Sequence, residues 1–333
     1  MLHDKIASYI DKHDLIDADS TVIVGLSGGA DSVALLYFLN TLRPRYNLKL
    51  IAAHLDHQWR ANSSDDAVFC QSLAEKLGIE FVARTVSDLL LIQKISIRKT
   101  SSKEEQGRNL RRAFFEDIAQ TYNAKTIALG HHADDQQETF FLRLIRGASV
   151  AGLAAMKPKN GLYIRPLLEC SKSELIEYLN QRRQSHCEDS TNNDTNYLRN
   201  AIRHKVIPAF ELSDHRFHGT FKKTLQSLQE TDKYLEKIVN EHLAKIAHSS
   251  NGTIVLHGEE LLKIDAFLHP RILVAWLSNT GVPYTPSTAF FNELMRFIRN
   301  SGKKHLINGS WGLKKVGPFI TIERFKKNVD EIS

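Results

Sequence analysis

A short loop near the N-terminus carries the first residues whose types and spacing suit chemistry. Residues 27–32 read SGGADS and lie between an apolar run at 21–26 and a helix-like pattern at 32–42. Backbone amides at a helix N-terminus bind anions, and Gly28 and Gly29 allow a close approach to the backbone. The hydroxyls of Ser27 and Ser32 add two donors. The loop therefore predicts a phosphate site.

Asp31 lies inside this loop, where a carboxylate repels phosphate unless a cation bridges the two. Mg²⁺ is usually held by one or two carboxylates together with substrate phosphates. We therefore interpret Asp31 as a magnesium ligand that helps to hold pyrophosphate as a leaving group. The patterns GxxxxGK[ST] and GxGxxG do not occur, which argues against a P-loop NTPase and a simple dinucleotide site. The alternative is an ordinary glycine turn whose aspartate caps the helix.

The elements that position this loop alternate between strands and helices. Strand patterns cover 21–26, 48–57, 81–86, 126–130 and 162–167, and helix patterns cover 32–42, 63–78, 103–123, 134–147 and 173–183. This alternation predicts an α/β fold with a parallel, doubly wound sheet. The first, second and fourth strands each end in a polar cluster. Since the carboxyl ends of parallel strands share one edge, we expect a single site there.

Apolar spacing indicates which helix faces are buried. Leu110, Phe114 and Ile118 recur at i, i+4 and i+8, and the helix at 134–147 is expected to turn Phe141, Leu142 and Ile145 inward. Ser171 and Glu174 have the spacing of a capping box.

The pattern changes near residue 187. A polar loop leads into 196–210, which predicts a short basic helix ended by Pro208, and a long helix follows from Phe217. Beyond Asn251 we expect two helices and a strand-rich run at 307–325. The chain is thus predicted to contain a catalytic domain at 1–212 and a smaller α+β domain at 213–333, which begins with the long linking helix.

The composition limits the class of protein. The chain has 333 residues and a formal net charge of +6, compatible with nucleic acid as a partner. No apolar run approaches the ~20 residues that span a bilayer, and the N-terminus lacks a signal-peptide pattern. We therefore expect a cytoplasmic protein without a membrane segment. Three widely spaced cysteines predict buried free thiols rather than a disulfide framework or a zinc ribbon.

Several blocks of the sequence resemble a known family. SGGxDS is typical of PP-loop ATP pyrophosphatases, which split ATP into AMP and pyrophosphate while adenylating an oxygen. Within that group, residues ~20–210 resemble the tRNA(Ile)-lysidine synthetases in 54-HLDHQWRANS-63, 104-EEQGRNLRRAFF-115, 130-GHHADDQQETFFLRLIRG-147, 165-RPLLECSKSEL-175 and 189-DSTNNDTNYLRNAIRHKVIP-208. The C-terminal part is only loosely similar, and we expect it to lack a further domain of longer members.

Four residues depart from the family pattern. Gln58 and Trp59 stand where the family usually has Gly-Leu, Gly107 stands for alanine, and Arg112 stands for tyrosine. These departures affect the second-strand motif and the arginine motif, whereas the phosphate loop follows the pattern.

The resemblance implies a two-step reaction with ATP and Mg²⁺. ATP adenylates C2–O of cytidine 34 in an isoleucine tRNA with a CAU anticodon, and the ε-amine of free L-lysine then displaces AMP to give lysidine. Asp31 is the implied magnesium ligand. The implied ATP-binding residues are Ser27, Gly28, Gly29, Ala30, Asp31, Ser32, Asp56, His57, Arg108, Arg111, Gly130 and His131. A homodimer is compatible with this reading.

The implied reaction suggests roles for the charged residues in blocks 104–115 and 130–147. Asp135 and Glu138 lie at i and i+3, and we expect them to bind lysine or a metal and to accept a proton. Asp134 is interpreted mainly as the helix N-cap. Arg108 and Arg111 lie one turn apart and are expected to neutralise the α-phosphate, the alternative being a solvated face.

Three further residues have weaker assignments. His131 and His132 suit a strand end that faces phosphate, although either could cap or pack, and their spacing does not favour zinc. Trp59 is one option for an aromatic wall against an unstacked cytidine.

Basic residues gather in two places. We expect tRNA contacts from Arg199, Arg203, Lys205, Lys303, Lys304, Lys314 and Lys315, with Arg216, Lys222, Lys223, Arg324, Lys326 and Lys327 nearby. The alternative is an ordinary solvated surface.

Three other functions fit the sequence less well. A sulfur-inserting tRNA thiolase usually has cysteine pairs, and an amidating ligase needs an ammonia source. A non-catalytic RNA-binding protein has no use for a leaving-group site.

Overall fold

The computed structural model describes residues 2–59, 63–93, 103–187, 197–250, 253–282, 284, 287–308 and 310–324. It divides into two compact units, Met1–Leu225 and Gln226–Ser333. The predicted polar loop at 188–196, together with Lys326 and Lys327, lies outside the described residues.

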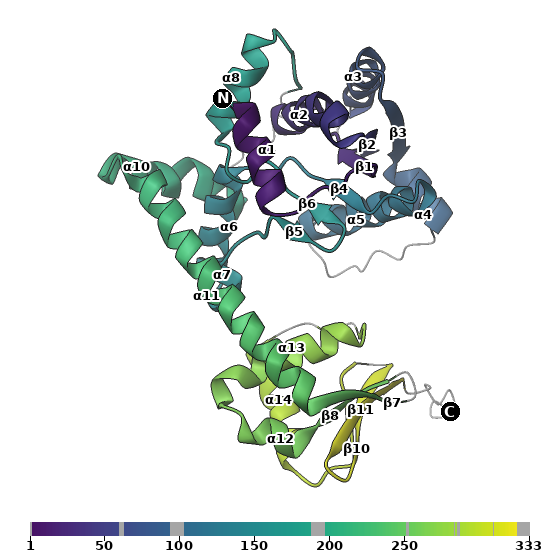
Figure 1. Cartoon of the computed structure of the whole chain (residues 1–333), viewed down its shortest axis with the longest axis vertical. Coiled ribbons are helices and arrows are strands. Elements are labelled where there is room, and N and C mark those ends of the chain that lie inside the picture. Colours follow the sequence, from purple (N-terminus) through teal and green to yellow (C-terminus); the bar gives the residue numbers. More distant parts are fainter. Residues whose placement is uncertain are drawn as a thin grey trace. The chain divides into compact units, whose positions relative to one another are not determined.

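The first unit contains a six-stranded sheet in the order β3-β2-β1-β4-β6-β5 (Figure 1). All neighbouring strands are parallel except β5, which runs antiparallel to β6. The parallel sheet predicted from the alternating pattern is therefore confirmed, and the fifth predicted strand is present as the short β6. The strands are β1 (Thr21–Gly25), β2 (Lys49–Asp56), β3 (Glu80–Thr85), β4 (Thr126–Ala128), β5 (Lys159–Asn160) and β6 (Tyr163–Ile164).

The helices of this unit follow the predicted order, with short additional segments. They are α1 (Leu2–Lys12), α2 (Ala30–Tyr46), α3 (Ser63–Lys76), α4 (Val86–Gln93), α5 (Lys103–Thr121), α6 (Ala133–Ile145), α7 (Val150–Leu153), α8 (Lys172–Gln181), α9 (Leu198–Ala201), the π-helical η2 (Ile202–Val206) and α10 (Ile207–Ser213).

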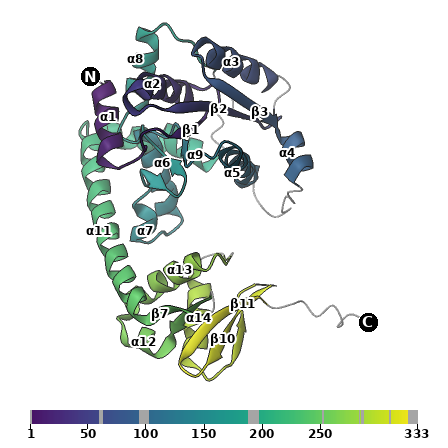
Figure 2. The ribbon, with the colours of Figure 1, turned by 45° about the vertical axis from the view of Figure 1, so that its right-hand side comes forward.

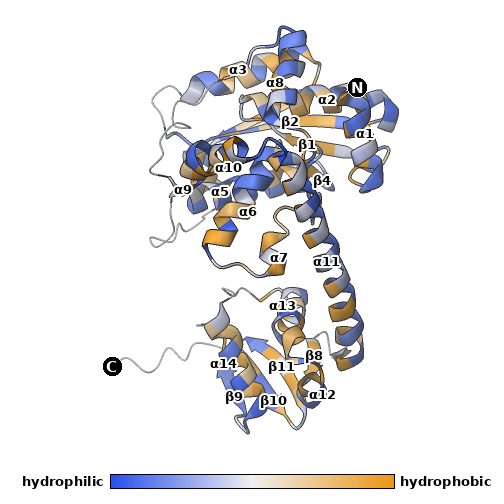
Figure 3. Cartoon of the chain, turned by 90° about the vertical axis from the view of Figure 1, so that its left-hand side faces the viewer, coloured by the Kyte–Doolittle hydropathy of each residue, from blue (hydrophilic) through white to orange (hydrophobic). Residues whose placement is uncertain are grey.

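Helices cover both faces of the sheet because the strand side chains alternate. Val22 and Val24 of β1 belong to a core with α1, α2, α3 and α8, whereas Ile23 belongs to a core with α4 and α5. Figure 2 shows α2 and α3 on one side of the strands and α5 on the other. The strands β1 and β2 are mainly hydrophobic along their length (Figure 3). The doubly wound arrangement is confirmed.

Most predicted buried positions are confirmed, but Leu142 is half-buried and Ile145 is not buried. Leu110, Phe114 and Ile118 are buried, and so is Phe141. The prediction for Ile145 was wrong, since its side chain is 58% exposed. Ile145 is the last residue of α6, one turn beyond Phe141 and its contacts with η2 and α10.

The prediction that Pro208 ends a helix was also wrong. Segments α9, η2 and α10 follow one another directly from Leu198 to Ser213, and Pro208 lies in the first turn of α10. Pro208 has no N–H to donate to the preceding turn, but it lies where the π-helical segment passes into α10, and the chain stays helical without that bond. The preceding π turn joins Ile207 N–H to Ile202 O, so the helical register has already changed before the proline.

The second unit contains a five-stranded antiparallel sheet in the order β7-β8-β11-β10-β9. Its core includes Leu256, Trp276, Leu294 and Ile320. The smaller α+β architecture is confirmed, although a third helix, the short α12, was not predicted. The elements are β7 (Ala247–Ser250), β8 (Thr253–His257), α12 (Gly258–Lys263), the 3₁₀ turn η3 (Ala266–Leu268), α13 (His269–Asn279), α14 (Thr288–Arg299), β9 (Lys304–Leu306), β10 (Trp311–Val316) and β11 (Phe319–Arg324).

Helix α11 (Phe217–Ile246) contains the division between the units at Leu225 and Gln226. The predicted domain boundary at 212/213 precedes this helix and stays a prediction. No disulfide joins the three cysteines, all of which lie in the described ranges; Cys70 and Cys170 are buried, as predicted, whereas Cys187 is half-buried. Across the described ranges, no helix is both long and apolar enough to cross a membrane.

Candidate active site

The loop between β1 and α2 has the backbone geometry of an anion site. Helix α2 begins at Ala30, and its N-cap Gly29 offers no side-chain acceptor to the first amides. Gly28 has a φ of 86°, which L side chains rarely adopt. A Cβ at Gly28 would also lie 3.0 Å from Cys187 Sγ. Both glycines therefore suit a turn that directs backbone N–H groups toward a negative charge.

Ser32 braces this loop from within. Its buried hydroxyl donates to Gly29 O at 2.9 Å and accepts from Ser27 N at 3.1 Å. The single hydroxyl hydrogen of Ser32 is thus used inside the loop. The membership of Ser32 in an ATP site stays a prediction.

The end of β4 passes directly beside the first turn of α2. A Cβ at Gly130 would lie 3.0 Å from the carbonyl carbon and oxygen of Asp31 and 3.1 Å from Ser32 N. Only glycine allows this approach without moving the backbone. The first and fourth strand ends therefore meet, as the shared-edge argument predicted.

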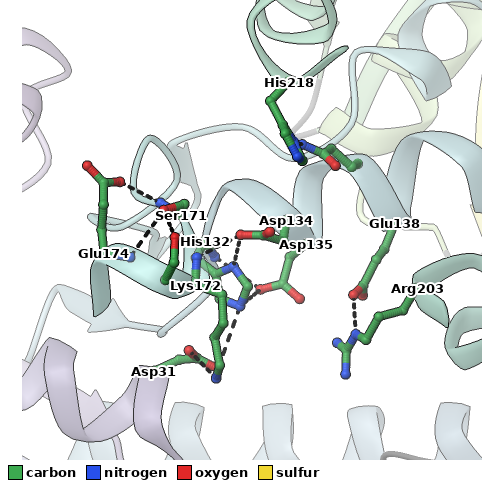
Figure 4. A network of polar contacts seen from close by, with 12 residues as sticks. Asp31, His132, Asp134, Asp135, Glu138, Ser171, Lys172, Glu174, Arg203 and His218 are labelled. Carbon is green, nitrogen blue, oxygen red and sulfur yellow. Dashed lines mark hydrogen bonds and ion pairs between the residues drawn. The ribbon is translucent and has the colours of Figure 1, made fainter. Parts of the chain in front are cut away.

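Two cations face Asp31, and both come from distant parts of the sequence (Figure 4). Lys172 Nζ donates to Asp31 Oδ1 at 2.6 Å, and His132 Nε2 lies 3.6 Å from Asp31 Oδ2. Lys172 is the first residue of α8, and His132 is the N-cap of α6. The carboxylate in the phosphate loop is thus compensated by charges from two other helices.

These contacts set the protonation states of Asp31 and His132. Burial by itself raises the pKa of Asp31, but the bonds and charges of His132 and Lys172 lower it to about 2. Burial likewise lowers the pKa of His132, but Asp134, Asp31 and Asp135 raise it to about 10. At neutral pH the site therefore contains an ionised Asp31 beside the imidazolium of His132.

The start of α6 differs from the expectation that Asp134 is its N-cap. The N-cap is His132, whose backbone N–H donates to Asp135 Oδ2 at 3.0 Å. Asp134 Oδ2 instead contacts His132 Nδ1 at 3.1 Å and accepts from Lys172 N at 2.8 Å. Asp134 therefore ties the starts of α6 and α8 together, because the helix N-cap lies two residues earlier than expected.

Asp135 and Glu138 are held by two arginines. Arg199 donates from Nη2 to Asp135 Oδ1 at 2.9 Å and from Nε to Glu138 Oε2 at 2.7 Å, and Arg203 Nε donates to Glu138 Oε1. The Glu138 side chain is only 1% exposed. These two acids thus bind cations, although here the cations are guanidinium groups of the same chain. Lysine binding by the acids and tRNA binding by the arginines stay predictions.

The end of β2 carries a second polar group. Asp56 Oδ1 accepts from Gln58 N at 2.7 Å, and Arg111 Nη2 lies 3.4 Å from His57 Nε2. The ring of Trp59 stacks on His57 with a centroid distance of 4.5 Å. Burial, followed by the charge of Arg111, lowers the pKa of His57 to about 4, so the imidazole is neutral at pH 7.

The predicted residues Arg108, Arg112 and His131 differ in their exposure and in their partners. Arg108 is exposed, and Arg112 pairs with Glu116 at 2.7 Å, as expected for a solvated helix face. Burial lowers the pKa of His131 to about 4, and its buried Nδ1 has no hydrogen-bond partner among the described residues. His131 is therefore a neutral ring with an unused polar atom at the strand end. Its role in ATP binding stays a prediction.

The basic residues expected to bind tRNA differ in their surroundings. In the second unit, Lys304 and Lys314 are directly paired across β9 and β10, so their side chains lie on the same sheet face. Lys303 is exposed, whereas Lys315 Nζ donates to Ile298 O and Asn300 O at the end of α14. In the first unit, Lys205 is exposed. Lys315 thus has a structural role that the charge pattern did not reveal.

Sequence reasoning missed one site residue, Lys172. It follows the helix cap Ser171, whose capping box with Glu174 is confirmed. The signal was its place in the block 165-RPLLECSKSEL-175, where a cation occupies the first turn of a helix. That position is electrostatically unfavourable unless an anion faces it.

Comparison with protein families and curated proteins supports this interpretation. Residues 2–210 match the model of a PP-loop domain. The chain is similar to the tRNA(Ile)-lysidine synthase of Bacillus cereus, at 32% identity over 98% of this chain and 70% of that protein. It is also similar to the enzyme of the same name from Bacillus subtilis, at 32% identity over 95% and 68%.

Among solved structures, the fold is similar to the U34-tRNA thiolase NcsA from Methanococcus maripaludis. The TM-score is 0.55 at 19% identity, over 68% of this chain and 78% of that one. This likeness concerns the fold alone. The chain spans about two thirds of the length of the two Bacillus relatives.

Proposed function

The chain belongs to the tRNA(Ile)-lysidine synthases, a family of ATP-using PP-loop ligases, and on this premise we propose its reaction. It joins free L-lysine to C2 of cytidine 34 in an isoleucine tRNA with a CAU anticodon, and it releases AMP and pyrophosphate. The observation that carries the proposal is the charged cluster of Asp31, His132 and Lys172 beside the phosphate loop.

In the first step, the C2 oxygen of cytidine 34 attacks the α-phosphorus of ATP. The first amides of α2 bind the departing pyrophosphate, and Lys172 and His132 supply positive charge next to it. Arg108 and Arg111 of α5 neutralise the α-phosphate. This division of labour is supported by the positions of the cations around Asp31, because each can exchange a carboxylate for a phosphate oxygen.

Asp31 is also suited to hold Mg²⁺. Its carboxylate is ionised and already faces an ammonium group, so it lies in a position that accepts a cation. No cluster of three or more His, Cys, Asp or Glu able to hold a metal is found across the described ranges. A magnesium ion would therefore share Asp31 with phosphate oxygens and water. When bound, it would shield phosphate charge during the release of pyrophosphate.

In the second step, the lysine ε-amine attacks C2 and displaces AMP. The amine has an ordinary pKa near 10.4 and must lose a proton first. Asp135 and Glu138 are suited to bind the ammonium group and take that proton, because they already hold the guanidinium groups of Arg199 and Arg203. Lysine thus competes with, or rearranges, an existing set of ion pairs.

The tRNA is held through its phosphates by basic residues of both units. The lysines with the best support are Lys303, Lys304 and Lys314, which have exposed or half-exposed side chains, together with Lys205. We further propose that the protein works in the cytoplasm, where tRNA, ATP and lysine are available. A homodimer remains part of this proposal.

The test is incorporation of labelled lysine into isoleucine tRNA with a CAU anticodon in the presence of Mg-ATP. A tRNA with C34→U serves as the control. We expect ATP-dependent labelling of the first tRNA alone, with one AMP formed for each lysine. Labelling of both tRNAs, or AMP formation with some other acceptor, would contradict the proposed substrate.

A further inference from the structure

Trp59 contacts two neighbouring residues although much of its side chain faces solvent. It is 48% exposed, whereas Trp276 is fully buried in the second unit. Large aromatic side chains gain free energy by burial, so an indole in water is unfavourable unless something covers it. The exposed part of the indole is therefore accessible to a ligand.

Two neighbours fix the indole. The ring of His57 is stacked on it, with centroids 4.5 Å apart and an angle of 24° between the planes. Its edge lies on the backbone of Gly107, where a Cβ would be only 2.7 Å from Cη2 and 2.8 Å from Cζ2. Any larger residue at position 107 would thus displace the ring.

Gly107 lies in the interior of α5, where glycine is unfavourable. It weakens a helix by ~1 kcal/mol relative to alanine because it loses more backbone entropy on folding. The chain accepts this cost at the position that carries the indole. Both the exposed ring and the weakened helix are explained if the ring has a ligand.

The surroundings indicate what that ligand is. Trp59 follows the end of β2, which is the neighbour of the strand that leads into the phosphate loop. Arg111 lies one turn after Gly107 on α5 and reaches His57 Nε2 at 3.4 Å. An exposed aromatic ring near Arg111 suits an unpaired nucleobase with its phosphate, since every base can stack on an aromatic ring.

We propose that Trp59 is a stacking platform for an unpaired nucleobase and that His57 and Gly107 position it. The inference rests on the proposed function, which supplies two such bases, the adenine of ATP and the unstacked cytidine 34. Both have the same stacking chemistry. The neutral imidazole of His57 fits this arrangement, because it stacks on the indole without adding a charge.

Fluorescence of the indole tests the platform directly. The wild-type protein and the Trp59→Phe variant are titrated with AMP and, separately, with an anticodon stem-loop that has either cytidine or an abasic site at position 34. We expect quenching in the wild-type protein that is absent from Trp59→Phe. Quenching by AMP assigns adenine, and quenching that requires the cytidine assigns the tRNA base.

Kinetics provide the second readout. Replacing Trp59 by alanine should raise KM for the substrate that carries the base by roughly ten- to a hundred-fold, whereas Trp59→Phe should keep most of the affinity. Gly107→Ala should raise the same KM in the wild-type background and have little further effect together with Trp59→Ala. A shared thermal midpoint among the variants excludes a general folding defect.

The proposal is overturned if neither ligand changes the fluorescence of Trp59 and the KM values of Trp59→Ala stay within twofold of wild type. The AMP titration requires no lysine and no tRNA. If the wild-type protein binds AMP but makes no lysidine, the proposed function fails while the platform is still tested.

Discussion

Lys172 Nζ lies 2.6 Å from Asp31 Oδ1 although 141 positions separate the two residues. The phosphate loop has no lysine of its own, and this ammonium group arrives from the start of α8 instead. A cation in the first turn of a helix opposes the helix dipole, so the contact with Asp31 accounts for its position. The loop proposed to bind phosphate thus has a carboxylate and a positive charge beside it.

Replacing Lys172 by methionine should lower kcat/KM for ATP by about 10²-fold, because it removes a charge that, in the proposed reaction, lies next to the departing pyrophosphate. AMP formation at varied ATP is the measurement. The matched control is Lys5→Met, since Lys5 makes a similar contact with Glu174 of the same helix at 2.8 Å. If both variants lose activity equally, the effect comes from α8 and not from the phosphate loop.

Replacing Arg199 and Arg203, which both donate to Glu138, should lower the free energy of unfolding by roughly 3–5 kcal/mol, because the buried Glu138 carboxylate would lose its partners. The variant is Arg199→Met with Arg203→Met, and urea unfolding gives the free energy. Adding Glu138→Met should recover a large part of the loss. A double variant as stable as the wild type would mean that water or another group already satisfies Glu138.

Gly130→Ala should raise KM for ATP and lower the unfolding free energy by about 1–3 kcal/mol, since the new Cβ would push against the backbone of Asp31. Gly219→Ala is the control, because nothing lies within 4 Å of its Cβ position in α11. That control should be neutral or stabilising, by up to ~1 kcal/mol. An unchanged KM in Gly130→Ala would show that the loop tolerates a shift.

Changing Lys304 and Lys314 to glutamine should flatten the salt dependence of tRNA binding, by about 0.7–0.9 in slope for each phosphate that is no longer neutralised. Lys315→Gln should leave the slope unchanged but lower thermal stability, because Lys315 bonds the carbonyls at the end of α14. Filter binding at several salt concentrations separates the two effects. A salt slope that falls only in Lys315→Gln would mean that Lys315, and not Lys304 or Lys314, contacts the tRNA phosphates.

The stability of the ligand-free protein should fall as pH rises from about 6.5 to 10. The folded pKa of His132 is about 10, above its ordinary 6.5, so the native state binds the proton more tightly than the unfolded state. The stabilisation is complete below pH 6.5 and is lost as pH approaches 10. In thermal unfolding, His132→Gln should show a smaller decrease over this range. An equal decrease in the wild type and in His132→Gln would mean that a group other than His132 binds the proton.

Much of the first unit could be predicted from the sequence because its signals are local. Runs of β-branched residues identified the strands, the spacing of Leu110, Phe114 and Ile118 identified a helix face, and Ser171 with Glu174 identified a helix start. SGGADS indicated the phosphate loop because strand, glycines and helix follow directly in the chain. Errors arose where a boundary depends on its neighbours, as at Asp134, Ile145 and Pro208.

The composition of the site was decided by the tertiary structure. The order of the strands brings the end of β4 beside β1, so His132 reaches Asp31, and the start of α8 brings Lys172 to the same carboxylate. Arg199 meets Glu138 across 61 positions in the same way. Local pattern thus determined the elements and the phosphate loop, whereas the partner of each charge was set by packing, because side chains pair through space and not along the sequence.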